Sequence, residues 1–324
     1  MTPLSHRDRL LRAISHQEVD RVPATFIAEP DVQARVQQAF GLEDLYAVIR
    51  HFGCDTTHVG IYKAPPDLTR VESAEEVDAL PWFGAHDTDF DGVIARLQEA
   101  RDAGLAVLGG AWATIFTGPR REMGEAKFLM ALLDEPDLIA RVVEKTADCY
   151  LEINAALFSR AADLIDVFYF GSDFGTQRSL FLSAATFRRF FKPHMARLVQ
   201  QAKEYELKVM FHTCGAVSEL IPDFIAIGVD ALDPVQVSAA GMSPGSLAAR
   251  FKGQIAFHGG ISTQTTLPHG TPEQVRAEVA AAIEILGPTG YVCAPDQAMM
   301  GDTPLENIVA LYDTVRCANA KGKM

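Results

Sequence analysis

Residues 208–236 read KVMFHTCGAVSELIPDFIAIGVDALDPVQ, and this stretch decides the fold class. Lys208–His212 is a short apolar run of the kind that forms a buried β-strand. Ser218–Ile227 has the apolar spacing of a helix, and Ala231–Asp233 is a second strand-like run. A strand, a helix and another strand in this order predict a βαβ unit, whose two strands are parallel.

The same alternation extends in both directions along the chain. Further strand-like runs are Val22–Ile27, Thr57–Ile61, Leu105–Leu108, Leu164–Phe170, Gln254–His258 and Gly290–Ala294. Further segments with helical spacing are Gly92–Ala103, Pro136–Arg160, Ser183–Glu204, Thr271–Ile285 and Pro304–Ala318. Eight strands separated by helices predict the α/β class, as a single (β/α)8 TIM barrel with an N-terminal helical extension over residues 1–324. A doubly wound open sheet is the alternative, but its glycine-rich turn, G-x-G-x-x-G, is absent.

Proline marks two of the predicted helices. Thr271-Pro272 places a capping residue ahead of proline at the first helical position, and Gly287-Pro288 should end the same helix. Pro193 lies inside Ser183–Glu204 and lacks a backbone donor, so it should break or kink that helix.

The composition excludes several classes of protein. The 29 Lys and Arg residues against 42 Asp and Glu residues give a net charge of −13, so the chain lacks the positive charge that nucleic acids and anionic membranes attract. No apolar run reaches the roughly 18–20 residues that cross a bilayer. The N-terminus lacks the apolar core of a secretory signal, and five cysteines, an odd number, do not form a disulfide framework. These features predict a cytoplasmic protein that acts on a small molecule.

Polar side chains collect where the predicted strands end. These residues are Asp173, Gln177, His212, Cys214, Gln236, His258, Cys293 and Gln297. In a (β/α)8 barrel the C-terminal ends of all strands meet at one mouth, where the active site is built. Helical faces would scatter such residues around the molecule, so their position predicts an enzyme.

His212 and Cys214 are the sharpest local feature. Because residues i and i+2 of a strand share a face, the imidazole and the sulfur converge on one point. Imidazole and thiolate suit Zn²⁺, and a third protein ligand would leave the fourth position open. Cys293 is the other cysteine expected at this mouth, and we expect it to be that ligand. The alternative is that His212 is a hydrogen-bonded pocket residue and Cys214 a small buried side chain.

The remaining candidates have roles assigned by residue type. Asp173, in a glycine-flanked turn, is a candidate general acid or base, or a partner for a cationic group; the alternative is a turn-forming residue. His258 is a candidate catalytic base, or a strand-end histidine that donates to backbone. Three glutamines suit substrate binding because an amide hydrogen-bonds to amides and carboxylates, although each also suits a loop cap: Gln177, Gln236 and Gln297.

A series of short motifs runs in order along nearly the whole chain. It comprises Arg7-Asp8-Arg9-Leu10 to Val19-Asp20-Arg21-Val22-Pro23, Phe187–His194, Phe211–Gly215, Ile227-Gly228-Val229-Asp230-Ala231, Phe257–Gly260 and Thr303-Pro304-Leu305-Glu306-Asn307-Ile308. In this series the chain resembles the uroporphyrinogen decarboxylase superfamily, which includes cobamide-dependent methyltransferases that act on coenzyme M or tetrahydrofolate. The resemblance implies one (β/α)8 barrel, often dimeric, with its pocket at the C-terminal mouth.

Two positions bear on the branch of this superfamily. Decarboxylases of uroporphyrinogen carry an arginine-rich loop after the first strand, where this chain has Ala24–Glu29, so a polycarboxylate would lack its clamp. The His212-x-Cys214 motif instead resembles the methyltransferase branch, in which it binds zinc. The third zinc ligand there is a cysteine at the position that Gln297 occupies. Either Cys293 replaces it by a change of register, or Gln297 or Asp296 binds through oxygen, or the site is vestigial.

Together these features favour a methyltransferase. It would move a methyl group between a corrinoid or a methylated small molecule and a thiol or tetrahydrofolate, with Zn²⁺ assisting. The chain lacks an Asp-x-His-x-x-Gly corrinoid signature, so a corrinoid would arrive on a separate partner protein, whereas tetrahydrofolate would be a co-substrate. A homodimer is expected. The alternative is a lyase that decarboxylates a small acid without metal, using Asp173 and His258, and a non-enzymatic binding protein is the third hypothesis.

Overall fold

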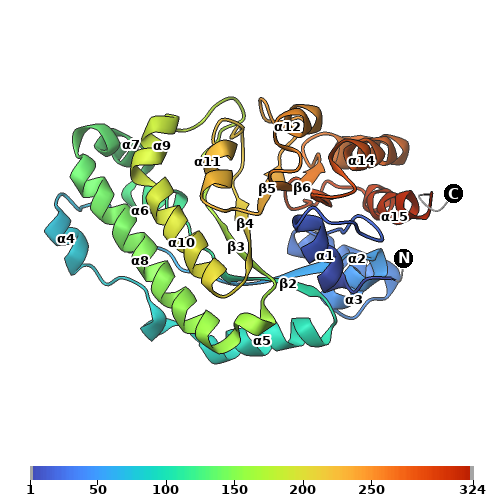
Figure 1. Cartoon of the computed structure of the whole chain (residues 1–324), viewed down its shortest axis with the longest axis horizontal. Coiled ribbons are helices and arrows are strands. Elements are labelled where there is room, and N and C mark those ends of the chain that lie inside the picture. The colour runs from blue at the N-terminus through green and yellow to red at the C-terminus, as the bar shows by residue number, and fades with distance from the viewer. Residues whose placement is uncertain (1–2, 322–324) are drawn as a thin grey trace. The chain divides into compact units, whose positions relative to one another are not determined.

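The structure is a computed structural model that describes residues 3–321 (Figure 1). Its strands are β1 (Thr56–Ile61), β2 (Ala106–Ala111), β3 (Val167–Gly171), β4 (Lys208–His212), β5 (Ala231–Val235), β6 (Ala256–Ile261) and β7 (Tyr291–Pro295). The strand order follows the chain, and the pairs β2–β3, β3–β4, β5–β6 and β6–β7 are parallel. This arrangement confirms the predicted α/β class, because parallel strands need covering helices between them.

Helices separate most of these strands. The three that precede β1 are α1 (His6–Ile14), α2 (Pro30–Phe40) and α3 (Leu45–Phe52). The others are α4 (Ala74–Ala79), α5 (Phe90–Asp102), α6 (Thr117–Met123), α7 (Glu125–Asp134), α8 (Pro136–Ala161), α9 (Ala184–Phe190), α10 (Lys192–Glu204), α11 (Ile221–Ala226), α12 (Pro244–Phe251), α13 (Thr266–His269), α14 (Pro272–Leu286) and α15 (Leu305–Lys321). The predicted break at Pro193 is confirmed, because α9 ends before it and α10 starts with it in the first turn. The predicted start of α14 is confirmed too, with Thr271 and Gln274 forming a capping box.

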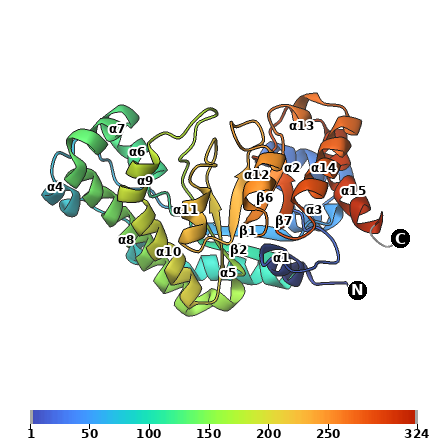
Figure 2. The same cartoon turned by 45° about the horizontal axis from the view of Figure 1, so that its top comes forward.

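Contacts between residues group the chain into two compact units. Unit 1 comprises Met1–His58, Gln98–Val107 and Asp230–Met324, and unit 2 comprises Val59–Leu97 and Leu108–Val229. In unit 1, α14 packs along α15; in unit 2, the long helix α8 packs along α10 (Figure 2). A single domain over residues 1–324, with α1–α3 as an extension, stays a prediction.

The predicted strand Val22–Ile27 is wrong as a regular strand. Ala24 and Ala28 form isolated parallel bridges with Cys293 and Met299 instead. The segment still lies between β7 and the chain entering β1, since Ala24 also accepts the backbone N–H of Asp55 at 2.7 Å. A regular ladder cannot form there because Pro23 has no N–H and the Ala24 N–H donates to the Asp55 carboxylate, at 2.9 Å. Seven regular strands are therefore described where eight were expected.

The buried carboxylate of Asp55 ties the N-terminal segment to β1. Arg9 and Arg21 donate to it at 2.5–2.8 Å, and the His6 ring nitrogen lies 2.8 Å away. Burial opposes ionisation of this carboxyl, but the hydrogen bond to His6 and the charges of Arg21 and Arg9 outweigh it, so the pKa of Asp55 lies below its ordinary value. A fully buried anion is thus neutralised by two cations.

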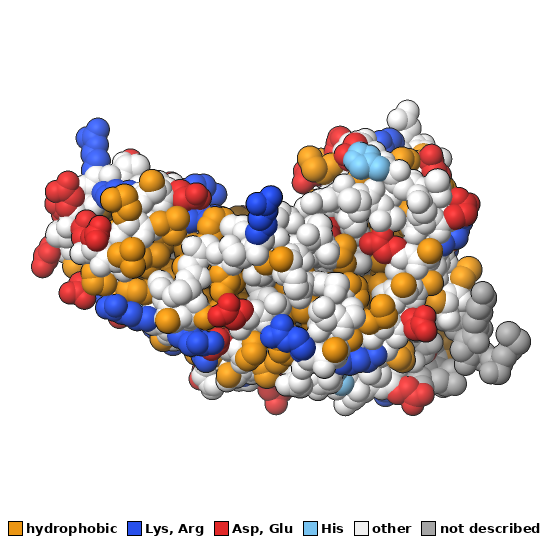
Figure 3. Space-filling model, turned by 90° about the horizontal axis from the view of Figure 1, so that it is seen from above, with side chains coloured by type: hydrophobic (Ala, Val, Ile, Leu, Met, Phe, Trp, Pro, Cys, Tyr) orange, Lys and Arg blue, Asp and Glu red, His pale blue; other side chains and the backbone are white. Residues whose placement is uncertain are grey.

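The surface carries charges of both signs. Figure 3 shows acidic and basic side chains interspersed over one face of the molecule. Within residues 3–321, no helix is both long and apolar enough to cross a membrane.

Replacing Asp55 tests this buried ion cluster. We expect Asp55→Asn to lower the free energy of unfolding by about 3–5 kcal/mol at neutral pH, because the buried Arg9 and the partly buried Arg21 lose the buried carboxylate that they share. The pKa of Asp55 is lowered on folding, so its contribution is present above the ordinary carboxyl pKa and fades as pH falls. In urea titrations, the difference in free energy of unfolding between the unmodified protein and Asp55→Asn should become smaller below about pH 4. Asp78→Asn, which breaks an exposed pair with Arg141, is the control; equal losses in both variants would refute the idea.

Candidate functional site

The candidate site lies in unit 2, where the loops after β3 and β4 touch backbone to backbone. A Cβ on Gly175 would lie 2.7 Å from the Cys214 carbonyl oxygen, and one on Gly215 would lie 2.4 Å from the Gly175 carbonyl carbon. Gly215 also has φ = +88°, which side-chain-bearing residues rarely adopt. The Phe174 N–H donates to the Thr213 hydroxyl at 3.0 Å, which fixes the register of the two loops. Only glycines permit this approach.

The loop contact brings the Asp173 carboxylate to Cys214. The backbone N–H of Cys214 donates to Asp173 Oδ1 at 2.9 Å. On the other side, the backbone N–H of Asp173 donates to the Thr117 hydroxyl at 2.8 Å, at the start of α6. The Ser172 hydroxyl accepts the N–H groups of Phe116 and Thr117. Asp173 is therefore held from both α6 and the β4 loop.

Asp173, His212 and Cys214 form the one group among the described residues whose donor atoms all lie close enough to share a metal ion, within 4.8 Å of one another. Cys214 Sγ is 3.2 Å from His212 Nε2, which is 3.6 Å from Asp173 Oδ1. Ligands on a tetrahedral Zn²⁺ with bonds of about 2.0–2.3 Å lie about 3.3–3.8 Å apart. A nitrogen, a sulfur and an oxygen donor at these separations fit zinc.

Neighbouring groups bear on His212 and Cys214. Tyr169 Oη lies 3.4 Å from His212 Nδ1. A proton on Nδ1, pointing to Tyr169, leaves the Nε2 lone pair free for a metal. Burial raises the pKa of the Cys214 thiol, although His212 opposes this rise. The thiol thus keeps its proton until a cation takes its place.

Cys293, the expected third ligand, lies in unit 1 and is fully buried. Paired residues of parallel strands point to the same face, and Cys293 pairs with Gly259 whereas His258 pairs with Val292. The Cys293 side chain therefore points to the opposite face of the sheet from the His258 side chain. Burial raises the pKa of its thiol to about 12. The donor group described above contains Asp173 and does not contain Cys293.

A comparison with models of known protein families identifies the family of this chain. The family model described as uroporphyrinogen decarboxylase (URO-D) matches residues 31–317. The chain belongs to the URO-D family. A curated relative of this URO-D chain is the methylcobamide:CoM methyltransferase MtbA of Methanosarcina mazei, which is 22% identical over 354 residues and 98% of each chain.

Solved structures support the fold of this URO-D chain. A methyltransferase from Methanosarcina mazei matches with a TM-score of 0.72 at 16% identity, over 99% of this chain and 100% of that one. An L-ribulose 3-epimerase matches with a TM-score of 0.51 at 13% identity, over 94% and 97% of the two chains. These similarities concern the TIM-barrel-like fold.

The other predicted site residues divide between the two units. In unit 1, His258 is buried, with Nδ1 at 2.5 Å from Asp233 Oδ1 and Nε2 at 2.9 Å from the Thr25 hydroxyl. Gln236 is buried after β5 and Gln297 is partly exposed after β7, whereas Gln177 is exposed in the β3 loop of unit 2. The roles predicted for His258 and the three glutamines stay predictions.

Two site residues were not singled out from the sequence of this URO-D chain. Tyr169 faces His212 from β3, and the Trp112 ring lies 5.4 Å from the His212 ring. Trp112 directly follows β2, which ends at Ala111 and not at Leu108 as expected. If the end of β2 had been predicted correctly, the rule that site residues follow strand ends would have identified Trp112.

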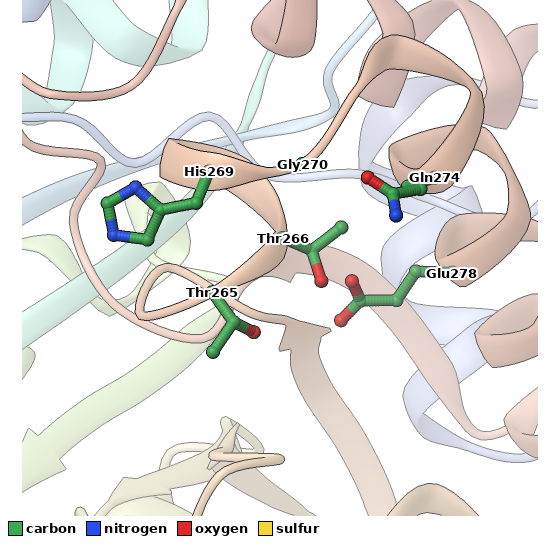
Figure 4. A pocket seen from close by; sticks show the side chains of 6 residues that line it. All are labelled: Thr265, Thr266, His269, Gly270, Gln274 and Glu278. Atoms are coloured by element: carbon green, nitrogen blue, oxygen red, sulfur yellow. The ribbon is translucent and has the colours of Figure 1, made fainter.

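A separate cavity of about 290 Å³ lies in unit 1 (Figure 4). Its lining residues are Thr265, Thr266, His269, Gly270, Gln274 and Glu278. Gln274 accepts the Thr271 N–H at 2.8 Å, and Glu278 accepts the Ser262 N–H at 2.9 Å. Because these atoms hold the start of α14 and the end of β6, the trio in unit 2 is the better candidate site.

Replacing Gly215 tests the loop contact. We expect Gly215→Ala to weaken metal binding and to lower the free energy of unfolding by about 2–4 kcal/mol, since the new Cβ meets the Gly175 backbone at an unfavourable φ. Gly41→Ala is the control, because Gly41 lies in the left-handed helical region at φ = +64° and has nothing within 4 Å of a new Cβ. It should cost only the conformational part, about 1–2 kcal/mol. Chemical denaturation measures the stability of each variant, and metal titration measures its metal affinity. Equal losses in the Gly215 variant and the control would show that the loop contact does not matter.

Proposed function

We propose that this URO-D chain is a methyltransferase whose metal centre, Asp173, His212 and Cys214, holds Zn²⁺ beside the methyl acceptor. The observation that carries the proposal is the convergence of three different donor atoms at separations that suit zinc. Similarity over the whole chain to a methylcobamide:CoM methyltransferase supports the same reaction class. The acceptor is a thiol or tetrahydrofolate. The donor is a methylated small molecule or a corrinoid delivered by a separate protein.

The residues of the trio have distinct tasks. Zinc, when bound, would keep a thiol acceptor in its thiolate form near neutral pH. Cys214 and Asp173 supply two negative charges, and the neutral His212 ring supplies a nitrogen. The Cys214 N–H and the Thr117 hydroxyl hold Asp173 in place, so the carboxylate needs little reorganisation when it binds a cation.

The lyase alternative is less well supported. Its predicted base, His258, is buried, and its ring nitrogens lie at hydrogen-bond distance from Asp233 Oδ1 and the Thr25 hydroxyl. A metal-free protein that still turns over a small acid would favour the lyase.

Cys214→Ser tests the metal centre. We expect bound zinc and methyl transfer to fall together, by tenfold or more, because a hydroxyl replaces a thiolate. The melting midpoint should change little, since the backbone hydrogen bonds that shape the site remain. Metal content after reconstitution, calorimetry and turnover are the measurements. Cys149→Ser, a buried cysteine on α8, is the control; zinc content that survives Cys214→Ser would refute the centre.

Thiol labelling separates Asp173 from Cys293 as the third ligand. If Asp173 binds the metal, zinc should protect Cys214, and Cys293 should be unreactive in the apo and zinc-loaded forms alike, because it is fully buried. Asp173→Asn should then lower zinc affinity while Cys293→Ala keeps the full metal content. The reverse pattern would establish Cys293 as the ligand.

Turnover tests the reaction class itself. Methylcobalamin is offered with a panel of small thiols and with tetrahydrofolate, and demethylation is followed by absorbance. We expect zinc-dependent transfer to one acceptor class. A fully zinc-loaded protein that transfers no methyl group to any of them would contradict the proposal for a corrinoid donor.

A further inference from the structure

Three aromatic side chains of unit 2 form a corner beside the metal centre. Tyr62 follows β1, Trp112 follows β2 and Tyr169 lies in β3. The ring centroids of Tyr62 and Trp112 are 6.3 Å apart, and those of Trp112 and Tyr169 are 4.9 Å apart, nearly perpendicular at 72°. The Trp112 ring also lies 5.4 Å from that of His212. We call these three residues the aromatic corner.

The position of Trp112 in the corner is fixed by its neighbours. Its backbone N–H donates to the Ile61 carbonyl at 2.8 Å. Gly171 leaves room for the indole, because a Cβ there would lie 2.8 Å from the indole ring and 2.7 Å from the Cβ of His212. A side chain at residue 171 would therefore push the indole away from the metal centre.

The corner is open to a solute. Tyr62 is 64% exposed, and Trp112 and Tyr169 are partly exposed. The same holds for the nearby Asp173 carboxylate, whose side chain is 36% exposed. Aromatic faces and a carboxylate that share an accessible region attract organic cations.

The charges around the corner agree with a cationic ligand. Zn²⁺ with the Asp173 carboxylate, the Cys214 thiolate and neutral His212 has a formal charge of 2 − 1 − 1 = 0, so the metal centre would not repel a cation. The chain as a whole carries −13.

We propose that the aromatic corner binds the methylated onium group of a small methyl donor, a quaternary ammonium or a sulfonium. This inference rests on the proposed function and adds the class of donor. Aromatic faces bind such cations through their negative electrostatic potential, whereas a neutral group of the same shape gains only apolar contact. In the transfer, the acceptor thiolate forms a bond to the methyl carbon while the carbon–nitrogen or carbon–sulfur bond breaks. The bonding pair leaves with the neutral amine or thioether.

Tryptophan fluorescence tests binding without turnover. The chain has two tryptophans, and Trp82 is buried with its indole N–H donated to the Val77 carbonyl. In a Trp82→Phe background, Trp112 is the only tryptophan reporter. Choline and trimethylsulfonium should each change its emission in a saturable way, with and without zinc. The neutral isostere 3,3-dimethylbutan-1-ol should bind at least about tenfold more weakly. Calorimetric titration of the unmodified chain repeats the comparison if Trp82→Phe unfolds the protein.

Variants separate the corner from a general apolar surface. Tyr62→Leu should weaken choline binding several-fold, whereas Tyr205→Leu, at the opposite end of β4 from His212, should leave it unchanged. Tyr169→Phe keeps the aromatic face, so it should retain choline binding even where zinc affinity falls. Equal binding of choline and the neutral isostere, or no response of Trp112 to either cation, would overturn the inference. Methyl transfer from methylcobalamin would be unaffected by that outcome, so the two proposals fail separately.

Discussion

The close approach of two backbones at Gly175 and Gly215 is the constraint on which the candidate site depends. It leaves no room for a side chain at either residue, and it sets the loop after β3 against the loop after β4. Asp173 reaches the backbone N–H of Cys214 only because of that contact. The Asp173 carboxylate thereby meets the imidazole and the thiol of the His212-x-Cys214 motif at one point.

Below these loops, aromatic packing makes the contact rigid. Phe174, between Asp173 and Gly175 on the loop, is fully buried and stacks on Phe116, with ring centroids 4.9 Å apart. Phe187 and Phe191 each pack edge-on against the Phe174 ring. In packing this dense, a volume change of even one methylene group disturbs the neighbouring side chains. The polar residues of the loop are therefore held by the core as well as by their hydrogen bonds.

Strand ends were informative in the sequence because a parallel sheet places them all at one edge. That rule pointed to His212, Cys214 and Asp173, which do lie together. The rule says nothing about how the strands pair. Sequence alone does not give the phase of β7, and that phase sets the side of the sheet on which Cys293 lies. The Val22–Ile27 segment has strand composition, but Asp55, distant in sequence, takes the donor that a ladder would need.

The segmented make-up of unit 1 has a consequence for biosynthesis. Ala24 pairs with Cys293 of β7, so this bridge forms only after β7 has been made. Unit 2 ends at Val229, so the contacts within it can form while the ribosome is still adding the residues from Asp230 onward. On a ribosome that releases the chain from its N-terminus, unit 2 therefore completes its packing first. The ion cluster of Arg9, Arg21 and Asp55 can also form early, whereas the bridge from Ala24 to Cys293 must wait for β7.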